Sequence, residues 1–240
     1  MPKLSIIIPC YNEADCIKDN MEKKVVPFLK ENKVDYELIL VSDGSKDNTA
    51  EVIKNMSGII PIAYSPNRGK GGAVKEGILN ASGEFILFMD ADLSTDLSAI
   101  NDVIQNMDKY DFIMGSRHLK GSKLPQKQPL IRQFVGWCCR KLVNMTFHFN
   151  YKDTQCGFKA IKTDIAKDIA RKQIINGFAF DVEYLYYAKL HKIKALEIPV
   201  TWINDTSSTV KVASASTQFL KDMRKMKKNK QNYLKELSND

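Results

Sequence analysis

Two carboxylates separated by one residue, Asp90 and Asp92 on either side of Ala91, directly follow the apolar run Phe85–Met89. Oxygen ligands in this arrangement can share a hard divalent cation, Mg²⁺ or Mn²⁺, with the oxygens of a diphosphate. They could also belong to a helix N-cap with a spare acid, because Ser94 and Asp96 also precede a helical pattern. A D-x-D pair is a weak signal by itself, and its position after a strand favours the metal interpretation.

A glycine-rich segment, Asn67-Arg68-Gly69-Lys70-Gly71-Gly72, opens a predicted helix. Glycines let the backbone approach an anion, and basic side chains at a helix N-terminus favour phosphate. The spacing differs from that of a P-loop, and a simple glycine turn before a helix explains the segment equally well.

Further polar residues follow the first two predicted strands. Tyr11 could hold a base by stacking, and Asp43 could accept a hydrogen bond from a base or ribose. Helix capping by Asn12 and turn formation by Asp43 are the structural alternatives.

The elements that must position these residues alternate between strands and helices. Each predicted strand is a short apolar run, and a helical pattern follows it. The strands are expected at Leu4–Ile8, Glu37–Val41, Ile59–Ala63, Phe85–Met89 and Phe112–Met114. This alternation predicts an α/β fold with a mostly parallel, Rossmann-like sheet flanked by helices, and such sheets bind ligands at the carboxyl ends of their strands.

The second half of the chain is more aromatic and more basic. It predicts an amphipathic helix at Leu130–Phe149 and another in the tail, at Ser216–Lys235. Shorter elements are expected at Gly157–Ile161, Asp164–Arg171, Val182–Leu190 and Ala195–Trp202. We therefore expect one domain over residues 1–210 and a basic amphipathic C-terminal extension over residues 211–240.

Composition excludes several classes of protein. With 240 residues, 44% of them hydrophobic, the chain can bury a core, which rules out wholesale disorder, collagen and a disulfide-stapled mini-domain. No apolar run is long enough for a signal peptide or a membrane span, so we expect a cytoplasmic chain. The five cysteines lack paired C-x-x-C spacing and are predicted to be buried thiols.

The net charge of +8 is unevenly distributed. The stretch Phe112–Lys152 holds eight basic and no acidic residues, and Lys211–Asp240 holds eight basic and three acidic ones. Either stretch is a solvated surface, or it contacts an anionic partner such as nucleic acid, a lipid headgroup or a phosphorylated substrate.

Taken as a set, these motifs resemble the inverting family-2 glycosyltransferases with the GT-A fold. The segments that carry the resemblance are PCYNE (9–13), SDGSKDNT (42–49), NRGKGGAVKEG (67–77), MDADLS (89–94) and GSR (115–117). Within that family the chain is similar to the enzymes that transfer sugars to dolichyl or other polyprenyl phosphates. DTQCGFK (153–159) and FAFDVE (178–183) are similar to the glucosyl branch, whereas MDADLS looks more like the mannosyl form.

The resemblance implies a role for each matching residue. Donor binding would fall to Pro9, Tyr11, Asn12, Glu13, Asp43, Lys70, Asp90, Ala91 and Asp92. Asp90 and Asp92 would hold Mg²⁺ or Mn²⁺, with Asp92 as the more direct ligand. The catalytic residues would be Asp92, Arg117 and Asp181, and the acceptor would be bound by Arg117, Arg132 and Gln155.

The implied reaction is an inverting, metal-dependent transfer of a hexose from a nucleotide sugar to a lipid phosphate. Such an acceptor needs cations more than a base, because its second pKa is about 6. We expect UDP-glucose as donor and a peripheral position on an anionic membrane surface, with a membrane protein as a possible further partner. The alternatives are GDP-mannose as donor, or a soluble or polysaccharide hydroxyl acceptor with Asp181 as its base. A nucleic-acid-binding protein is the most distant alternative, since the strand-end acids would repel DNA.

Overall fold

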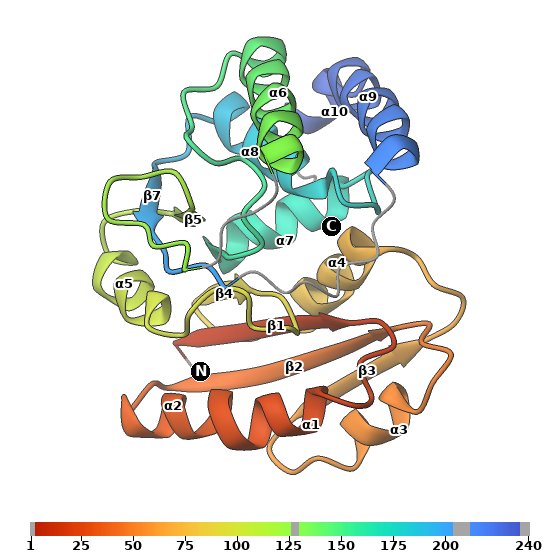
Figure 1. Ribbon diagram of the computed structural model, residues 1–240, viewed down its shortest axis with the longest axis vertical. Helices are drawn as coiled ribbons and strands as arrows, with labels where there is room; N and C mark the ends of the chain where they lie inside the picture. The colour runs from red at the N-terminus through yellow and green to blue at the C-terminus, as the bar shows by residue number, and fades with distance from the viewer. Residues whose placement is uncertain (1–2, 126–129, 204–211, 236–240) are drawn as a thin grey trace.

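The computed structural model describes residues 3–125, 130–203 and 212–235. Within these residues the strands form one seven-stranded sheet in the order β3-β2-β1-β4-β6-β5-β7 (Figure 1). The strands are β1 (Leu4–Cys10), β2 (Tyr36–Asp43), β3 (Ile60–Tyr64), β4 (Phe85–Phe88), β5 (Phe112–Ser116), β6 (Lys159–Lys162) and β7 (Ala195–Pro199). The predicted α/β class is confirmed.

Most neighbouring strands are parallel, and β6 is the exception. It pairs antiparallel with both β4 and β5, so that Lys159 lies opposite Phe88, the last residue of β4. The start of β6 is therefore at the same edge of the sheet as the end of β4. Strand order reverses between β1 and β4, and ligands of open α/β sheets bind outside the carboxyl ends of the strands at such a reversal.

Helices cover both faces of the sheet. A continuous helical segment is made of α1 (Ile17–Asn20), a π-helical turn (Met21–Val25) and α2 (Val26–Glu31). The others are α3 (Thr49–Lys54), α4 (Lys70–Asn80), α5 (Ala99–Asn106), α6 (Leu130–Phe147), α7 (Thr163–Lys172), α8 (Phe180–Leu190), α9 (Val212–Lys228) and α10 (Lys230–Tyr233). In Figure 1, α1, α2 and α3 lie below the sheet, and α4, α7 and α8 lie above it.

Side chains of the central strands alternate between two hydrophobic cores. Ile6 and Ile8 belong to the core under α1, α2, α3 and α5, whereas Ile7 belongs to the core under α4, α7 and α8. Successive strand residues point to opposite faces, so a continuous apolar run such as that of β1 is what a strand covered on both faces requires. This arrangement fixes the ends of β1, β2 and β4, where the polar motifs begin.

The C-terminal helices pack onto the second of these cores. Met223, Met226 and Tyr233 are buried in the cluster that also contains Phe180 and Tyr184 of α8. The tail helix extends over α9 and α10, starting earlier than predicted and breaking at Asn229. The predicted boundary between residues 210 and 211 lies outside the described residues.

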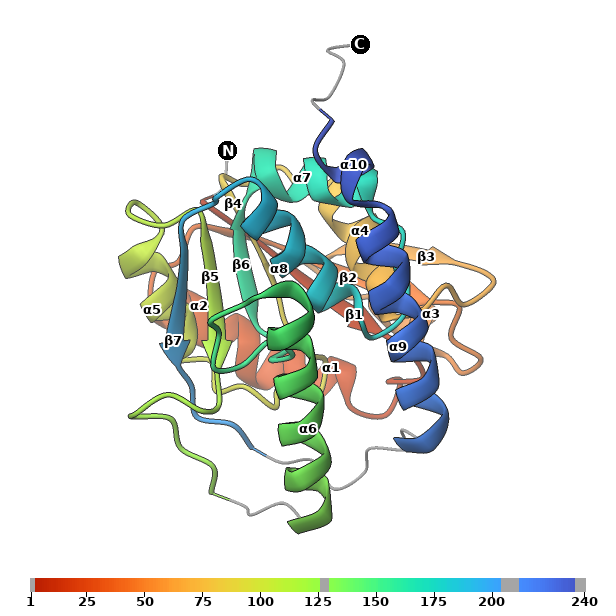
Figure 2. The same cartoon turned by 90° about the horizontal axis from the view of Figure 1, so that it is seen from above.

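Helix α6 has a buried end and an exposed end. Val143 and Phe147 lie in the core, while Phe134 is 64% and Trp137 is 48% exposed, with their rings stacked. The prediction that all five cysteines are buried is wrong: Cys138 is exposed on α6, and Cys16 and Cys139 are half-buried. Cys138 is exposed because the N-terminal part of α6 extends beyond the core (Figure 2).

Candidate active site

The Asp90-Ala91-Asp92 segment leaves the end of β4 as a fixed loop. Ala91 is buried, and its carbonyl oxygen accepts a hydrogen bond of 2.9 Å from the Asn20 side chain. Asp92 is exposed, and its Oδ1 accepts a hydrogen bond of 2.9 Å from the Ser94 amide. Because α5 begins only at Ala99, neither aspartate caps a helix, and that alternative is excluded.

Lys70, the first residue of α4, forms an ion pair with Asp90. Burial opposes the charge of Lys70, but the carboxylates of Asp90, Asp181 and Asp92 outweigh it and raise the pKa of Lys70. The structure therefore brings together four residues that the sequence analysis selected from three separate segments.

A fifth charged residue, Lys159, joins this group and was not predicted. Its side chain is 0% exposed, and its Nζ donates hydrogen bonds to Asp181 Oδ1 at 2.6 Å and to the Cys156 carbonyl oxygen at 2.5 Å. Asp181 lies in the first turn of α8 and is buried. Burial raises the pKa of Asp181, while the charges of Lys159 and Lys70 oppose that rise. Asp181 was among the predicted residues, and the only sequence signal for Lys159 was a lysine inside a short predicted strand.

The carboxylate of Asp43, at the end of β2, is buried and holds the segment before α4. It accepts hydrogen bonds from the backbone amides of Arg68 and Gly69, at 2.7 and 2.8 Å, and from the Tyr64 hydroxyl at 2.8 Å. Gly69 has a φ of 91°, a conformation that glycine adopts without strain. Asp43 therefore shapes the glycine-rich segment, and its contact with a nucleoside stays a prediction.

The residues after β1 join the loop after β2. The Asn12 side chain accepts a hydrogen bond of 2.8 Å from the Lys46 amide, and the Glu13 amide donates one of 2.8 Å to Thr49 Oγ1. Pro9 is half-buried, and Tyr11 is 44% exposed beside this junction. The two loops thus form one unit at the carboxyl ends of β1 and β2, with Tyr11 open to solvent.

Arg117 follows β5 and is bound by a buried partner that was not predicted. Its guanidinium makes two hydrogen bonds with the Asp153 carboxylate, at 2.7 and 3.0 Å, and lies over the Trp202 ring. Asp153 Oδ1 also accepts a hydrogen bond of 3.2 Å from the Gln155 amide. Arg132 lies in α6, but its side chain is outside the described residues. The predicted acceptor residues Arg117 and Gln155 thus share one anchor, Asp153.

The carboxylates of Asp90 and Asp92 fit a hard divalent cation whose remaining ligands come from a diphosphate. Within the described parts of the chain, no group of three or more histidine, cysteine and acidic side chains could hold a metal. Two aspartates would need oxygen ligands from a bound molecule. Asp92 is exposed, and a Cβ on Gly157 would lie 2.2 Å from Asp90 Oδ2, so a glycine at position 157 is needed for the Asp90 carboxylate to lie where it does.

The sheet order and the strand reversal are those of an α/β protein that binds ligands at the carboxyl ends of its strands, where the paired aspartates lie. Residues 5–170 match the family described as Glycosyl transferase family 2. The chain belongs to this family and is a glycosyltransferase.

Curated relatives match most of the chain. It is 35% identical to the dolichyl-phosphate beta-glucosyltransferase of Dictyostelium discoideum, over 92% of this chain and 72% of that protein. Proteins of the same name from Saccharomyces cerevisiae and Homo sapiens are 32% and 33% identical. The yeast match covers 92% of this chain and 72% of the relative, and the human match covers 83% and 67%.

Solved structures share the fold at low sequence identity. Mannosyl-3-phosphoglycerate synthase from Rubrobacter xylanophilus has a TM-score of 0.69 and 15% identity, over 98% of this chain and 77% of that chain. Glucosyl-3-phosphoglycerate synthase from Mycobacterium tuberculosis, in complex with Mn²⁺, UDP-glucose and phosphoglyceric acid, has a TM-score of 0.67 and 14% identity. That match covers 94% of this chain and 79% of the other. These likenesses support the GT-A fold.

Proposed function

We propose that this protein transfers glucose from UDP-glucose to dolichyl phosphate or another polyprenyl phosphate, with inversion at the anomeric carbon and with Mg²⁺ or Mn²⁺. The observation that carries the proposal is the agreement of curated relatives, 29–35% identical over 83–92% of the chain, on one named activity. The Mn²⁺ and UDP-glucose bound to a structural neighbour support the choice of metal and donor.

The donor would bind at the ends of β1, β2 and β4. Tyr11, which is exposed at the end of β1, would cover the base, and the loops joined by Asn12 would form the floor of the nucleoside site. Asp90 and Asp92 would hold the cation, which when bound neutralises charge on the departing diphosphate. Lys70, already beside Asp90, would add a second positive charge at the leaving group.

The Lys159–Asp181 pair favours a phosphate acceptor over a hydroxyl acceptor. A general base must take up a proton during the reaction, and protonation of Asp181 would leave the charge of Lys159 buried without a partner. A phosphate acceptor arrives ionised and needs no base. Asp181 can then remain an anion throughout, and Arg117 is the cation on the acceptor side.

The exposed part of α6 fits contact with a membrane surface, which would bring the lipid acceptor to the site. Phe134, Trp137 and Met145 are exposed on a helix that also carries Arg140 and Lys141. Aromatic and basic residues on one interfacial helix are typical of peripheral membrane binding. In the described part of the chain, no helix is long and apolar enough to cross a bilayer.

The apolar side of α9 is occupied by the core, so the tail would meet a membrane through its charges. Met223 and Met226 are buried, whereas Lys221, Arg224 and Lys225 are exposed. Each basic side chain near an anionic surface contributes about 1 kcal/mol.

A donor and acceptor matrix tests the function. The purified protein with Mn²⁺ is incubated with UDP-glucose or GDP-mannose, and with dolichyl phosphate in detergent or 3-phosphoglycerate in buffer. Mass spectrometry then measures the glycosylated products. We expect glucosyl phosphodolichol as the main product, and its formation to stop when EDTA is added.

Two outcomes would contradict the proposal in different ways. Preference for GDP-mannose would replace the donor and keep the acceptor. Glycosylation of 3-phosphoglycerate without any lipid product would replace the acceptor class, and it would remove the reason for a membrane-facing α6.

A further inference from the structure

Glu183, the last residue of the FAFDVE motif, has no part in the chemistry described above. Its side chain is 0% exposed, and its carboxylate accepts three hydrogen bonds. Two come from the backbone amides of Ile174 and Ile175, at 2.8 and 3.0 Å. The third comes from the Tyr233 hydroxyl of α10, at 2.6 Å. A buried carboxylate with three donors fixes the segments that supply them.

The segment that Glu183 holds is packed against the glycine-rich start of α4. The Asn176 carbonyl oxygen accepts a hydrogen bond of 3.2 Å from the Gly72 amide. The Gln173 side chain donates one of 2.9 Å to the Gly71 carbonyl oxygen. A Cβ on Gly69 would lie 2.6 Å from the Asn176 carbonyl oxygen. The glycines are therefore needed for close contact with residues 173–176, in addition to any contact with a ligand.

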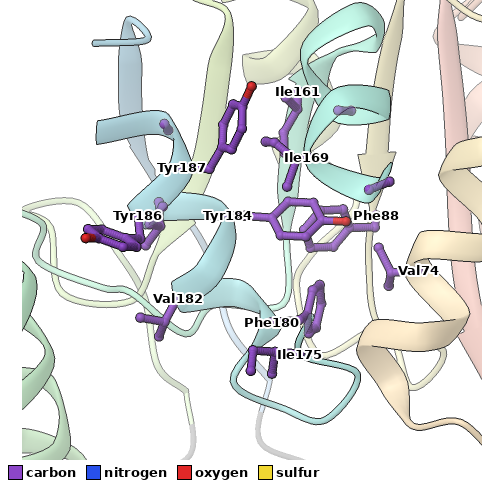
Figure 3. Close-up of a cluster of buried hydrophobic side chains, with 14 of the residues drawn as sticks. Val74, Phe88, Ile161, Ile169, Ile175, Phe180, Val182, Tyr184, Tyr186 and Tyr187 are labelled. Carbon is purple, nitrogen blue, oxygen red and sulfur yellow. The ribbon is translucent and has the colours of Figure 1, made fainter. Parts of the chain in front are cut away.

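The side chains packed beside this contact are apolar and partly aromatic. Phe180 and Ile175 lie together on the side of α8 that faces Val74 of α4 (Figure 3). The Tyr184 hydroxyl donates a hydrogen bond of 2.9 Å to Gln173 Oε1, which fixes the amide group that reaches Gly71. Residues 173–176 are thus held from α8 on one side and press on α4 on the other.

Tyr233 connects this arrangement to the end of the chain. It is 1% exposed, and its ring lies edge-on to that of Tyr186. Together the contacts run from α10 through Glu183 to residues 173–176, and from there to the segment that carries Lys70. Glu183 and Tyr233 both lie beyond residues 5–170, which match the family.

We propose that Glu183 and Tyr233 are positioning residues for donor binding: through residues 173–176 they hold the start of α4, and with it Lys70, in place for the donor diphosphate. The inference rests on the proposed function insofar as it places the diphosphate beside Lys70. The C-terminal helices α9 and α10 are then a working part of the donor site, and a truncated chain without them would lose donor affinity.

A pair of conservative variants tests this. Tyr233→Phe keeps the ring and removes the hydrogen bond to Glu183. Tyr187→Phe is the matched control: Tyr187 is also a buried tyrosine bonded to a carboxylate, that of Asp168 in α7. Among the described residues, this pair makes no direct hydrogen bond to residues 173–176, and Lys172 links Asp168 to the Tyr233 backbone but not to the Tyr233 hydroxyl. For each variant, titration calorimetry measures the Kd of UDP with Mn²⁺, and steady-state kinetics measures KM and kcat.

We expect Tyr233→Phe to raise the Kd of UDP and the KM of the donor about fivefold with kcat little changed, since one hydrogen bond to a charged group is lost. Tyr187→Phe should leave both values within about twofold of the wild type. It should lower Tm about as much as Tyr233→Phe does, because each variant loses one hydrogen bond to a carboxylate. Equal effects of the two variants on Kd would overturn the proposal and reduce Tyr233 to a general contributor to stability.

Hydrogen exchange of the unliganded protein gives a measurement that is independent of the proposed function. Amides of residues 69–73 should exchange faster in Tyr233→Phe than in Tyr187→Phe. Unchanged exchange at residues 69–73 in Tyr233→Phe would overturn the positioning role even in an active transferase. If the wild type does not bind UDP, the donor assignment fails, and the exchange result alone decides whether Tyr233 holds this segment. Glu183→Gln, which retains the shape of the side chain, should reproduce the exchange result more strongly.

Discussion

The two sides of the site are built differently. On the proposed donor side, the ends of β1, β2 and β4 present exposed groups such as Tyr11 and Asp92, and the Lys70–Asp90 ion pair there is partly exposed. On the proposed acceptor side, around β5, β6 and α8, Arg117 is paired with Asp153 and Lys159 with Asp181, and both acids are buried. The donor side thus has groups open to a cation and a nucleotide, whereas the acceptor side has a fixed electrostatic environment.

This difference accords with the proposed reaction. The donor side must bind and release a nucleotide and a cation in each cycle, so its ligands cannot be fully committed to protein partners. An ionised acceptor needs preorganised charge more than proton transfer, and buried ion pairs provide such charge without reorganisation.

The largest effect on activity is expected on the donor side. Asp92→Ala removes the exposed carboxylate proposed as the more direct metal ligand. We expect kcat to fall by about 10³-fold, which corresponds to on the order of 4 kcal/mol of activation free energy. Transfer assays over a Mn²⁺ series measure this. Asp96→Asn, an aspartate in the turn before α5, is the control and should remain active; equal losses in both variants would argue against a metal role for Asp92.

On the acceptor side, the expected effect is first on stability. Lys159→Met leaves Asp181 buried without its cation and should lower the free energy of unfolding by about 3 to 4 kcal/mol. The double variant Lys159→Met/Asp181→Asn should recover part of that loss, because neither charge is then left alone. Urea unfolding of the wild type, of Lys159→Met, of Asp181→Asn and of the double variant measures the coupling. Additive losses would mean that Lys159 and Asp181 do not interact. The acceptor side would then lack one of its two buried ion pairs.

Acid should weaken the Arg117–Asp153 pair. Burial by itself would raise the pKa of Asp153, but the Arg117 guanidinium outweighs it and holds the pKa well below its ordinary value. A depressed carboxyl pKa contributes stability that is fully present above the unfolded-state pKa, about 4, and that is lost as the pH falls further. Asp153→Asn should therefore cost on the order of 2 kcal/mol at pH 7 and progressively less below pH 4. A difference in unfolding free energy that does not change with pH would contradict this.

The smallest effect is expected at the surface of α6. Phe134→Ser/Trp137→Ser removes two exposed aromatic side chains and should weaken binding to vesicles containing anionic lipid by about tenfold, with Tm unchanged. Co-sedimentation measures the binding. Ile60→Ser, at an exposed position on β3, is the control. Unaltered vesicle binding in the α6 variant would remove the proposed membrane contact.

The residues on these two sides also differ in how well the sequence could predict them. Asp90 and Asp92 could be placed from sequence because a buried strand ends just before them, and parallel strands bring their carboxyl ends to one edge. Lys159 could not be placed, because the apolar pattern of β6 does not reveal that the strand runs antiparallel and starts beside the end of β4. Glu183 and Tyr233 are 50 residues apart in the chain, and no local pattern links them.

The glycines before and at the start of α4 have a structural role that the sequence analysis missed. Gly69 and Gly71 were expected to give a ligand access to the backbone. The structure shows residues 175 and 176 occupying the space next to them, a contact that the sequence pattern cannot indicate.

The sequence by itself determined the α/β class, the strand ends that carry Asp43, Asp90 and Asp92, and the family to which the chain belongs. These follow from local hydrophobic periodicity and short motifs. Only the tertiary structure decided which charges are paired, because Lys159, Asp153 and Tyr233 find their partners across the fold. The pairing of buried charges depends on distance in space and on exclusion of water, and neither is encoded in the spacing of residues along the chain.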